Sequence, residues 1–257
     1  MKTISAIFRF LKALIRKIFF STLPHAPLDH DGGVLCHQWQ NVKDIWNNNF
    51  PEPSKAITLE RWVKIILLST QFAFPGIYVR AIFGNYGKLW KNFGVELQVV
   101  FKLIIAYTIL HQGWWVCVHF TIFGYNPILL WCWWMILETI CYTANLVFSD
   151  DVFAKPHSHK RNVILLIIDY VVLNIDFASI YLITKSLKKS ADPIDLIVNT
   201  PIDAEYFSFI SSLTIGYGDI TAGTDDGKRI VICQVLTFLL FGVLFINFYT
   251  SRLNNRD

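Results

Sequence analysis

Residues 211 to 219 read SSLTIGYGD, in which two glycines flank a tyrosine between apolar stretches. Glycine disfavours a helix interior by roughly 1 kcal/mol, so Gly216 and Gly218 must serve the backbone itself. Glycine reaches the left-handed region at no steric cost, and a chain of alternating handedness can point successive carbonyls the same way. Such carbonyls can replace the water that a metal ion loses on entering a membrane. The chemistry indicated is binding of a dehydrated cation.

The composition places this segment in a membrane protein. The chain has 257 residues, of which 54% are hydrophobic and 16% are charged, whereas soluble domains carry about 25% charged residues. Its mean hydropathy is +0.43. The small net charge of +4 disfavours a nucleic-acid partner and favours basic loops near anionic lipid. The five cysteines, Cys36, Cys117, Cys132, Cys141 and Cys233, have no regular spacing, which argues against a disulfide framework.

Four segments are long enough to cross a hydrocarbon core of about 30 Å. These predicted spans are residues 99–123, 127–148, 162–184 and 230–250. The first two are joined by a tight turn and form a helical hairpin. We therefore expect an all-α membrane protein with three regions: a cytoplasmic or interfacial region at 1–98, the transmembrane hairpin at 99–150 and a further membrane module at 162–257.

The first 98 residues carry weaker signals. Apolar residues at helical spacing between positions 4 and 18 predict an amphipathic helix on the membrane surface or against another protein element. Its basic residues are Arg9, Lys12, Arg16 and Lys17. Residues 21–57 read as a loop because they are rich in Pro, Asp, Asn and Gly. Residues 62–79 are apolar but contain Lys64 and Pro75, so they predict an interfacial helix, a re-entrant segment or a fifth span.

The segment TIGYGD at Thr214–Asp219 resembles the selectivity filter of the potassium-channel pore family. Residues 203–213, DAEYFSFISSL, resemble the pore helix of that family, and residues 227–229 precede the last span at the usual place. The resemblance covers about residues 162–250: an outer helix, a pore helix, the filter and an inner helix. Two positions depart from the pattern, since Ala222 stands where proline is common and Leu213 where threonine is frequent.

This resemblance implies a potassium-selective channel, without bond chemistry, that conducts K+ passively and needs no organic cofactor. One filter per chain implies a homotetramer, because a ring of carbonyls needs about four strands. The ion would bind at Thr214, Ile215, Gly216 and Tyr217, supported by Gly218 and Asp219. The alternatives are a poorly selective cation channel or transporter-like pathway on the same filter, and a membrane enzyme or redox protein that would leave the glycines unexplained.

The pore helix has its own start signal. Thr200-Pro201-Ile202-Asp203 resembles a capping box with proline at the first helical position, and the helix should run to about Leu213. Its C-terminal end carries a partial negative charge. Aimed at the membrane centre, that end would favour a cation there.

Gating signals are sparse. A voltage sensor needs a basic residue at every third position of one span, and no span here has that pattern, so we expect no intrinsic voltage dependence. The last span contains Gly242, which predicts either a hinge or close helix packing. By resemblance to the family, Leu239, Gly242, Ile246 and Asn247 would face the cavity or inner gate.

Ionisable groups inside spans are functional candidates. Glu138 lies mid-span, Asp169 and Asp176 share one face of the third predicted span, and Lys102 is placed to snorkel or to pair with an acid. They predict either a proton- or lipid-sensing switch, or a buried ion pair or water-facing contact. His111 and His119 lie on similar faces of the first predicted span and could bind haem or a metal. A loop cluster could bind a metal, although its spacing matches no zinc pattern: His25, Asp29, His30, Asp31, Cys36 and His37.

The distribution of lysine and arginine favours cytoplasmic N- and C-termini. We therefore expect a multi-pass protein of the cell membrane. Its expected partners are other copies of itself and membrane lipid, with no nucleic acid.

Overall fold

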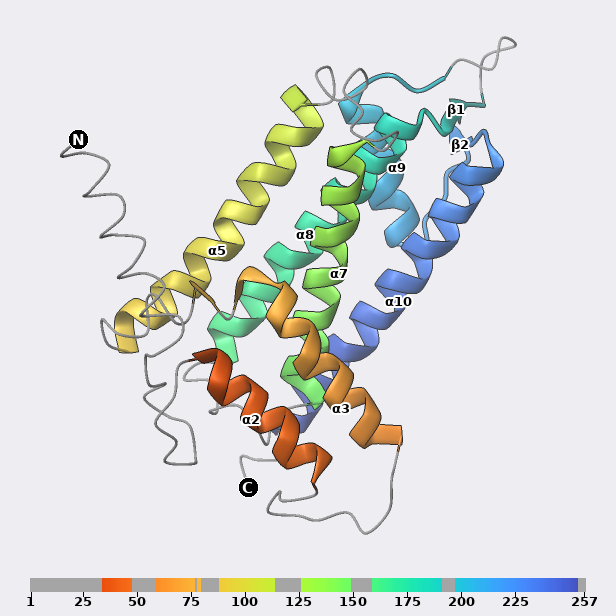
Figure 1. The fold of residues 1–257 in the computed structure, drawn as a ribbon. Helices are drawn as coiled ribbons and strands as arrows, with labels where there is room; N and C mark the ends of the chain where they lie inside the picture. The colour runs from red at the N-terminus through yellow and green to blue at the C-terminus, as the bar shows by residue number, and fades with distance from the viewer. Residues whose placement is uncertain are drawn as a thin grey trace, which may run out of the picture. The chain divides into compact units, whose positions relative to one another are not determined.

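The computed structural model of the chain describes residues 34–47, 59–76, 78–79, 88–113, 126–148, 159–190 and 197–253. Most of these residues are helical, as expected. The described residues also contain a two-stranded sheet, which the sequence did not predict. In chain order (Figure 1) the elements are α2 (Val34–Trp46), α3 (Leu59–Thr70), the 3-10 turn η1 (Gln71–Ala73), α5 (Lys88–Thr108), the π-helical turn η2 (Ile109–Gly113), α7 (Pro127–Phe148), α8 (His159–Thr184), β1 (Leu187–Lys189), α9 (Pro201–Ser212), β2 (Ile220–Ala222) and α10 (Asp225–Leu253).

Three of the described helices are long and apolar enough to cross a membrane. The candidate spans are Pro127–Asn145 in α7, Arg161–Thr184 in α8 and Asp225–Leu244 in α10. They correspond to the second, third and fourth predicted spans. The structure describes the first predicted span, residues 99–123, only as far as residue 113, so this span stays a prediction. The amphipathic helix predicted near the N-terminus lies outside the described residues.

The chain divides into two units, and the first comprises residues 1–98 and 144–158. There α2 packs on α3 through Val42, Ile45 and Leu68, and the Gln38 side-chain amide donates a hydrogen bond to the Leu68 carbonyl at 3.0 Å. With 12 residues, α3 rises only about 18 Å, too short for a span. The helix α3 is therefore too short to make residues 62–79 a fifth span by itself.

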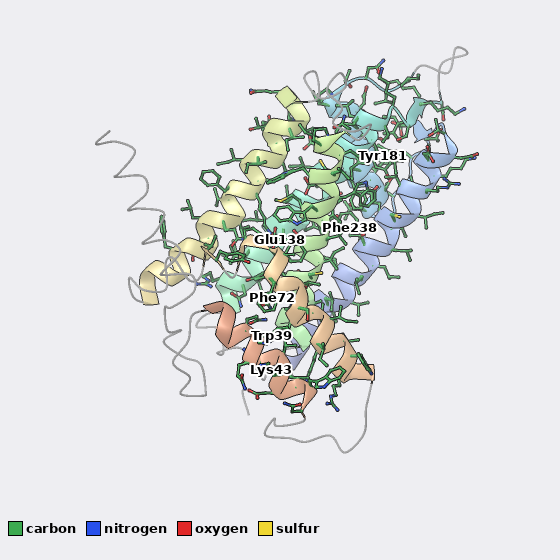
Figure 2. All side chains as sticks on the ribbon, in the orientation of Figure 1. Trp39, Lys43, Phe72, Glu138, Tyr181 and Phe238 are labelled. Carbon is green, nitrogen blue, oxygen red and sulfur yellow. The ribbon has the colours of Figure 1, made fainter. Side chains whose placement is uncertain are left out.

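The helix α2 corrects the expectation of a loop over residues 21–57. The Pro, Gly and Asp residues that suggested a loop lie mostly on either side of this segment, which itself contains no proline or glycine. Gln38, Val42 and Ile45 are buried at spacings of four and three residues, so one face of a helix is covered. Figure 2 labels the aromatic part of the packing, where Trp39 meets Phe72 edge-on and Lys43 lies over the Trp39 ring.

The second unit comprises residues 99–143 and 159–257, and α8 is its central helix. Almost every residue between positions 172 and 182 is buried, and α8 contacts η2, α9 and α10. The Phe177 ring lies 6.0 Å from Trp133 of α7 and 6.1 Å from Phe238 of α10. One helix therefore packs against the hairpin on one side and against the last two helices on the other.

Candidate functional site

The short helix α9 begins where the sequence predicts. The Thr200 hydroxyl oxygen accepts a hydrogen bond from the Asp203 backbone N–H at 3.3 Å, and Pro201 occupies the first turn. The Asp203 carboxylate also pairs with the Lys189 ammonium at 2.7 Å. Burial opposes ionisation of Asp203, but hydrogen bonds from Lys189 and Thr200 and the charge of Lys189 outweigh it and lower its pKa. The cap is confirmed, and β1 holds the start of the helix.

The segment after α9 has the alternating backbone that the two glycines predict. The φ angles of Thr214, Gly216 and Gly218 are +56°, +57° and +81°, whereas Ile215 and Tyr217 between them have no positive φ. Glycine adopts this region freely, but a residue with a side chain pays about 1–2 kcal/mol, so Thr214 is strained. Such alternation aligns neighbouring peptide groups.

This segment, residues 213–219, is exposed in the single chain. Tyr217 is 70% exposed, and a Cβ placed at Gly216 or Gly218 would meet nothing within 4 Å. The role of Tyr217 in the filter therefore stays a prediction. In the single chain, other described residues therefore leave the backbone of this segment uncovered.

Hydrogen bonds fix the C-terminal end of the segment. The Ser190 backbone N–H donates a hydrogen bond to the Asp219 carbonyl at 2.8 Å, and the Asp219 carboxylate lies near the Tyr206 hydroxyl of α9. The strands β1 and β2 pair antiparallel directly after it, with Lys188 opposite Thr221. The end of α8 and the chain leaving the segment are thus tied together.

Glycine is required at position 227 because the backbone of Ser186 lies too close to allow a side chain, and not because of its φ angle. A Cβ there would lie 2.7 Å from the backbone oxygen of Ser186. The nearest atom belongs to the backbone and not to the end of a flexible side chain, so the backbone itself would have to shift.

A buried polar network joins the three helices around the segment. Gln234 of α10 accepts a hydrogen bond from the Tyr181 hydroxyl of α8 at 2.6 Å. Its amide donates to the Ser208 carbonyl and hydroxyl oxygens of α9, both at 2.9 Å. Ser208 in turn donates to the Asn174 carbonyl of α8 at 2.8 Å. Because all four side chains are buried, α9 is held in one position against α8 and α10.

A second link lies one turn further along the same helices. The Tyr170 hydroxyl of α8 bonds the Ser212 hydroxyl at the end of α9 at 2.9 Å. Asn174 donates its side-chain amide to the Tyr170 carbonyl. Sequence reasoning missed both links. The available signal was a set of polar residues at spacings of four within otherwise apolar helices, at 170 and 174 and at 208 and 212.

The helix α10 presents an uncovered apolar stripe. Its members recur alternately at four and three residues and therefore share one face. Between 56% and 64% of each is exposed in the single chain: Ile232, Leu236, Leu239, Val243 and Ile246. Next to this stripe, a Cβ on Gly242 would meet nothing within 4 Å, so no packing inside the chain requires glycine there. The side chain of Asn247 lies outside the described residues.

The structure brings two of the predicted ionisable or histidine residues, Lys102 and His111, close to an acidic side chain. Lys102 of α5 and Glu138 of α7 form a buried ion pair at 2.8 Å, as one of the two predictions required. His111 of η2 lies 3.7 Å from Glu205 of α9, whereas His119 lies outside the described residues. Over the described ranges, no group of three or more His, Cys, Asp or Glu residues could hold a metal ion. The loop cluster of histidines and acids has no described side chain.

In a comparison with known proteins, residues 170–255 match a family model described as "Ion channel". Over 42 residues the chain is 55% identical to a "Hyperpolarization-activated voltage-gated potassium channel" of Methanocaldococcus jannaschii. That stretch covers 16% of this chain and 20% of the relative, so the chain spans about a fifth of the relative's length. No solved structure matches the chain.

Proposed function

We propose that this membrane protein is a potassium-selective channel, because residues 170–255 match a family model described as "Ion channel" and a stretch of 42 residues is 55% identical to a potassium channel. K+ would pass down its electrochemical gradient through a filter lined by Thr214, Ile215, Gly216 and Tyr217, with Gly218 and Asp219 as its support. The observation that carries the proposal is the alternating handedness from Thr214 to Gly218. A dehydrated K+ needs successive carbonyl oxygens in place of water, and a backbone of alternating handedness can supply them.

Four copies complete the filter in this proposal. A single strand surrounds no ion, and the filter segment and the apolar stripe on α10 are both uncovered in the single chain. In a homotetramer each would face its copies across a common axis. The C-terminal ends of four α9 helices would then point their partial negative charges at the cation path.

Gating in this proposal depends on α10. The stripe of large apolar side chains would line the inner end of the path, and a ring of such residues closes a pore by excluding water. Gly242 would allow the helix to bend, with Leu239 and Ile246 forming the narrowest part beside Asn247. The candidate span in α7 contains no basic residue, which supports a channel without an intrinsic voltage sensor. The proposed setting is the cell membrane, with cytoplasmic termini and anionic lipid around the basic segments.

Ion flux into liposomes tests this function. The full chain is reconstituted, and uptake of K+ is compared with uptake of Na+ for the wild type, Gly216→Ala and Tyr217→Ala. Alanine at a φ of +57° costs about 1–2 kcal/mol in each copy, so Gly216→Ala should abolish the preference for K+. Gly223→Ala is the control, because this glycine follows the filter and has no positive φ; its Cβ would lie 3.2 Å from the flexible Lys188 side chain, which can shift to make room.

Two results would contradict the proposal. Wild-type protein that admits Na+ as readily as K+ would favour the poorly selective alternative. Native mass spectrometry that finds only monomers or dimers in mild detergent would remove the tetramer on which the filter depends.

A further inference from the structure

Four buried ionisable side chains lie near one another inside the second unit, within or beside its candidate membrane spans. They are Lys102 of α5, Glu138 of α7, and Asp169 and Asp176 of α8, and their exposed fractions are 6%, 3%, 0% and 1%. Lys102 and Glu138 are paired at 2.8 Å, and Figure 2 labels Glu138 on α7. Both members of the pair lie close enough to the two aspartates to interact with them electrostatically.

The two aspartates lack the partners that buried carboxylates need. Neither oxygen of Asp169 and one oxygen of Asp176 have a hydrogen-bond partner, although all are inaccessible. The hydroxyl of Thr139, next to Glu138 on α7, is also buried without a partner. Buried polar groups are almost always hydrogen-bonded, so these unpaired oxygen atoms indicate that a ligand binds among them.

The charge balance identifies that ligand. Three carboxylates and one ammonium carry a net charge of −2 when all are ionised. An uncompensated charge away from water costs several kcal/mol. Two bound protons bring the net charge to zero, and a protonated carboxyl gains an O–H donor. A metal ion is disfavoured, because the described residues hold no suitable group of three or more ligands.

We propose that Asp169 and Asp176, beside the Lys102–Glu138 pair, form a proton-binding site within the membrane whose occupancy biases the pore. The second half of this proposal rests on the proposed channel function. The first half, proton binding, does not.

The route to the pore is α8 itself. Tyr170 and Asn174 lie about 120° around the helix from the two aspartates, and they reach Ser212 and Ser208 of α9. Proton loss would leave charge on the face of α8 that contacts the hairpin. Any shift of α8 that relieves this charge would be passed to α9 through these hydrogen bonds.

The charged groups that act on both aspartates are Lys102 of α5 and Glu138 of α7, and on α8 itself Arg161 lies about two turns before Asp169. The groups that α9 and α10 direct at α8 are the neutral side chains of Ser208, Ser212 and Gln234. In η2, His111 faces Glu205 of α9 instead. A pH effect that passes through α8 is therefore assigned to the two aspartates and the ion pair beside them.

Infrared spectroscopy of the reconstituted full chain tests proton binding directly. The wild type should show carbonyl bands of protonated carboxylic acids at neutral pH, and Asp169→Asn with Asp176→Asn should remove them. Asparagine matches the shape of a protonated aspartic acid, so the variant should fold. If it does not, Asp169→Asn alone should remove one of the two bands. The matched control is Asp226→Asn, an exposed acid paired with Arg229, which should keep both bands.

Potassium flux at a series of pH values tests the coupling. The wild-type open fraction should change by up to about tenfold per pH unit for each coupled proton, whereas the double asparagine variant should lose this dependence. The absence of protonated carboxyl bands in the wild type would overturn the proton site. A double variant with unchanged pH dependence would overturn the coupling. If even the wild type conducts no K+, the channel function and the coupling both fail, and the infrared result alone decides the proton site.

Discussion

Gln234 gives the sharpest test of how α9 is held. This side chain is fully buried in α10 and bonds both Tyr181 and Ser208. Gln234→Leu keeps most of its volume and removes the amide. Ser208 keeps its hydrogen bond to the Asn174 carbonyl at 2.8 Å, but the Tyr181 hydroxyl, in a residue that is 1% exposed, loses its acceptor.

The expected cost follows from that one hydroxyl. A buried group left without a partner costs about 1–3 kcal/mol, and side-chain hydrogen bonds in membrane proteins reach about 1.7 kcal/mol. We therefore expect Gln234→Leu to lower the free energy of unfolding by about 1–2 kcal/mol. Tyr181→Phe should cost a similar amount, because it leaves the amide oxygen of Gln234 unpaired. The double variant removes both partners and should cost clearly less than the sum.

The assay is reversible unfolding of the reconstituted chain in mixed micelles, followed by circular dichroism. The control cycle pairs Gln234→Leu with Tyr170→Phe, whose hydroxyl bonds Ser212 instead, and its effects should add. Additivity within about 0.5 kcal/mol in the Gln234–Tyr181 cycle would refute the reasoning, because two residues that share a buried hydrogen bond must couple.

Three further changes test the elements around the filter. Gly227→Ala should destabilise by about 1–3 kcal/mol in the same unfolding assay, because its Cβ would lie 2.7 Å from the Ser186 carbonyl oxygen; an unchanged stability would contradict this. The lowered pKa of Asp203 contributes stability above its unfolded value of about 3.9, and acid removes that contribution. Melting temperatures measured from neutral to acidic pH should therefore fall less for Asp203→Asn than for the wild type. Because the Asp203–Lys189 ion pair is partly exposed, the difference in stability should be no more than about 1 kcal/mol. Parallel curves for the two proteins would count against this reasoning. Gly242→Ala meets no atom within 4 Å, so it should fold normally yet reduce the open fraction in K+ flux if α10 bends there; unaltered flux would exclude the hinge.

The sequence alone determined the parts of this protein that depend on local geometry. Gly216 and Gly218 mark positions where the backbone takes a positive φ, and such positions can be read because few other residues tolerate them. The cap at Thr200 is equally local, since its partner lies three residues away. Long apolar stretches likewise identified α7, α8 and α10 as candidate spans.

Some local signals were too weak to read. Three-residue strands such as β1 and β2 are too short to show an alternating pattern. The helix α2 was hidden by the composition of its flanks. The positive φ of Thr214 has no signal of its own, because threonine rarely adopts it.

Only the tertiary structure decided which distant side chains meet. Lys102 could have paired with any of three acids, and it pairs with Glu138, 36 positions away. Gln234 looked like an isolated polar residue in an apolar helix, yet it joins Tyr181 and Ser208 at the centre of the unit. The periodicity of a helix tells which residues share a face, but the partner of that face is set by how the helices pack.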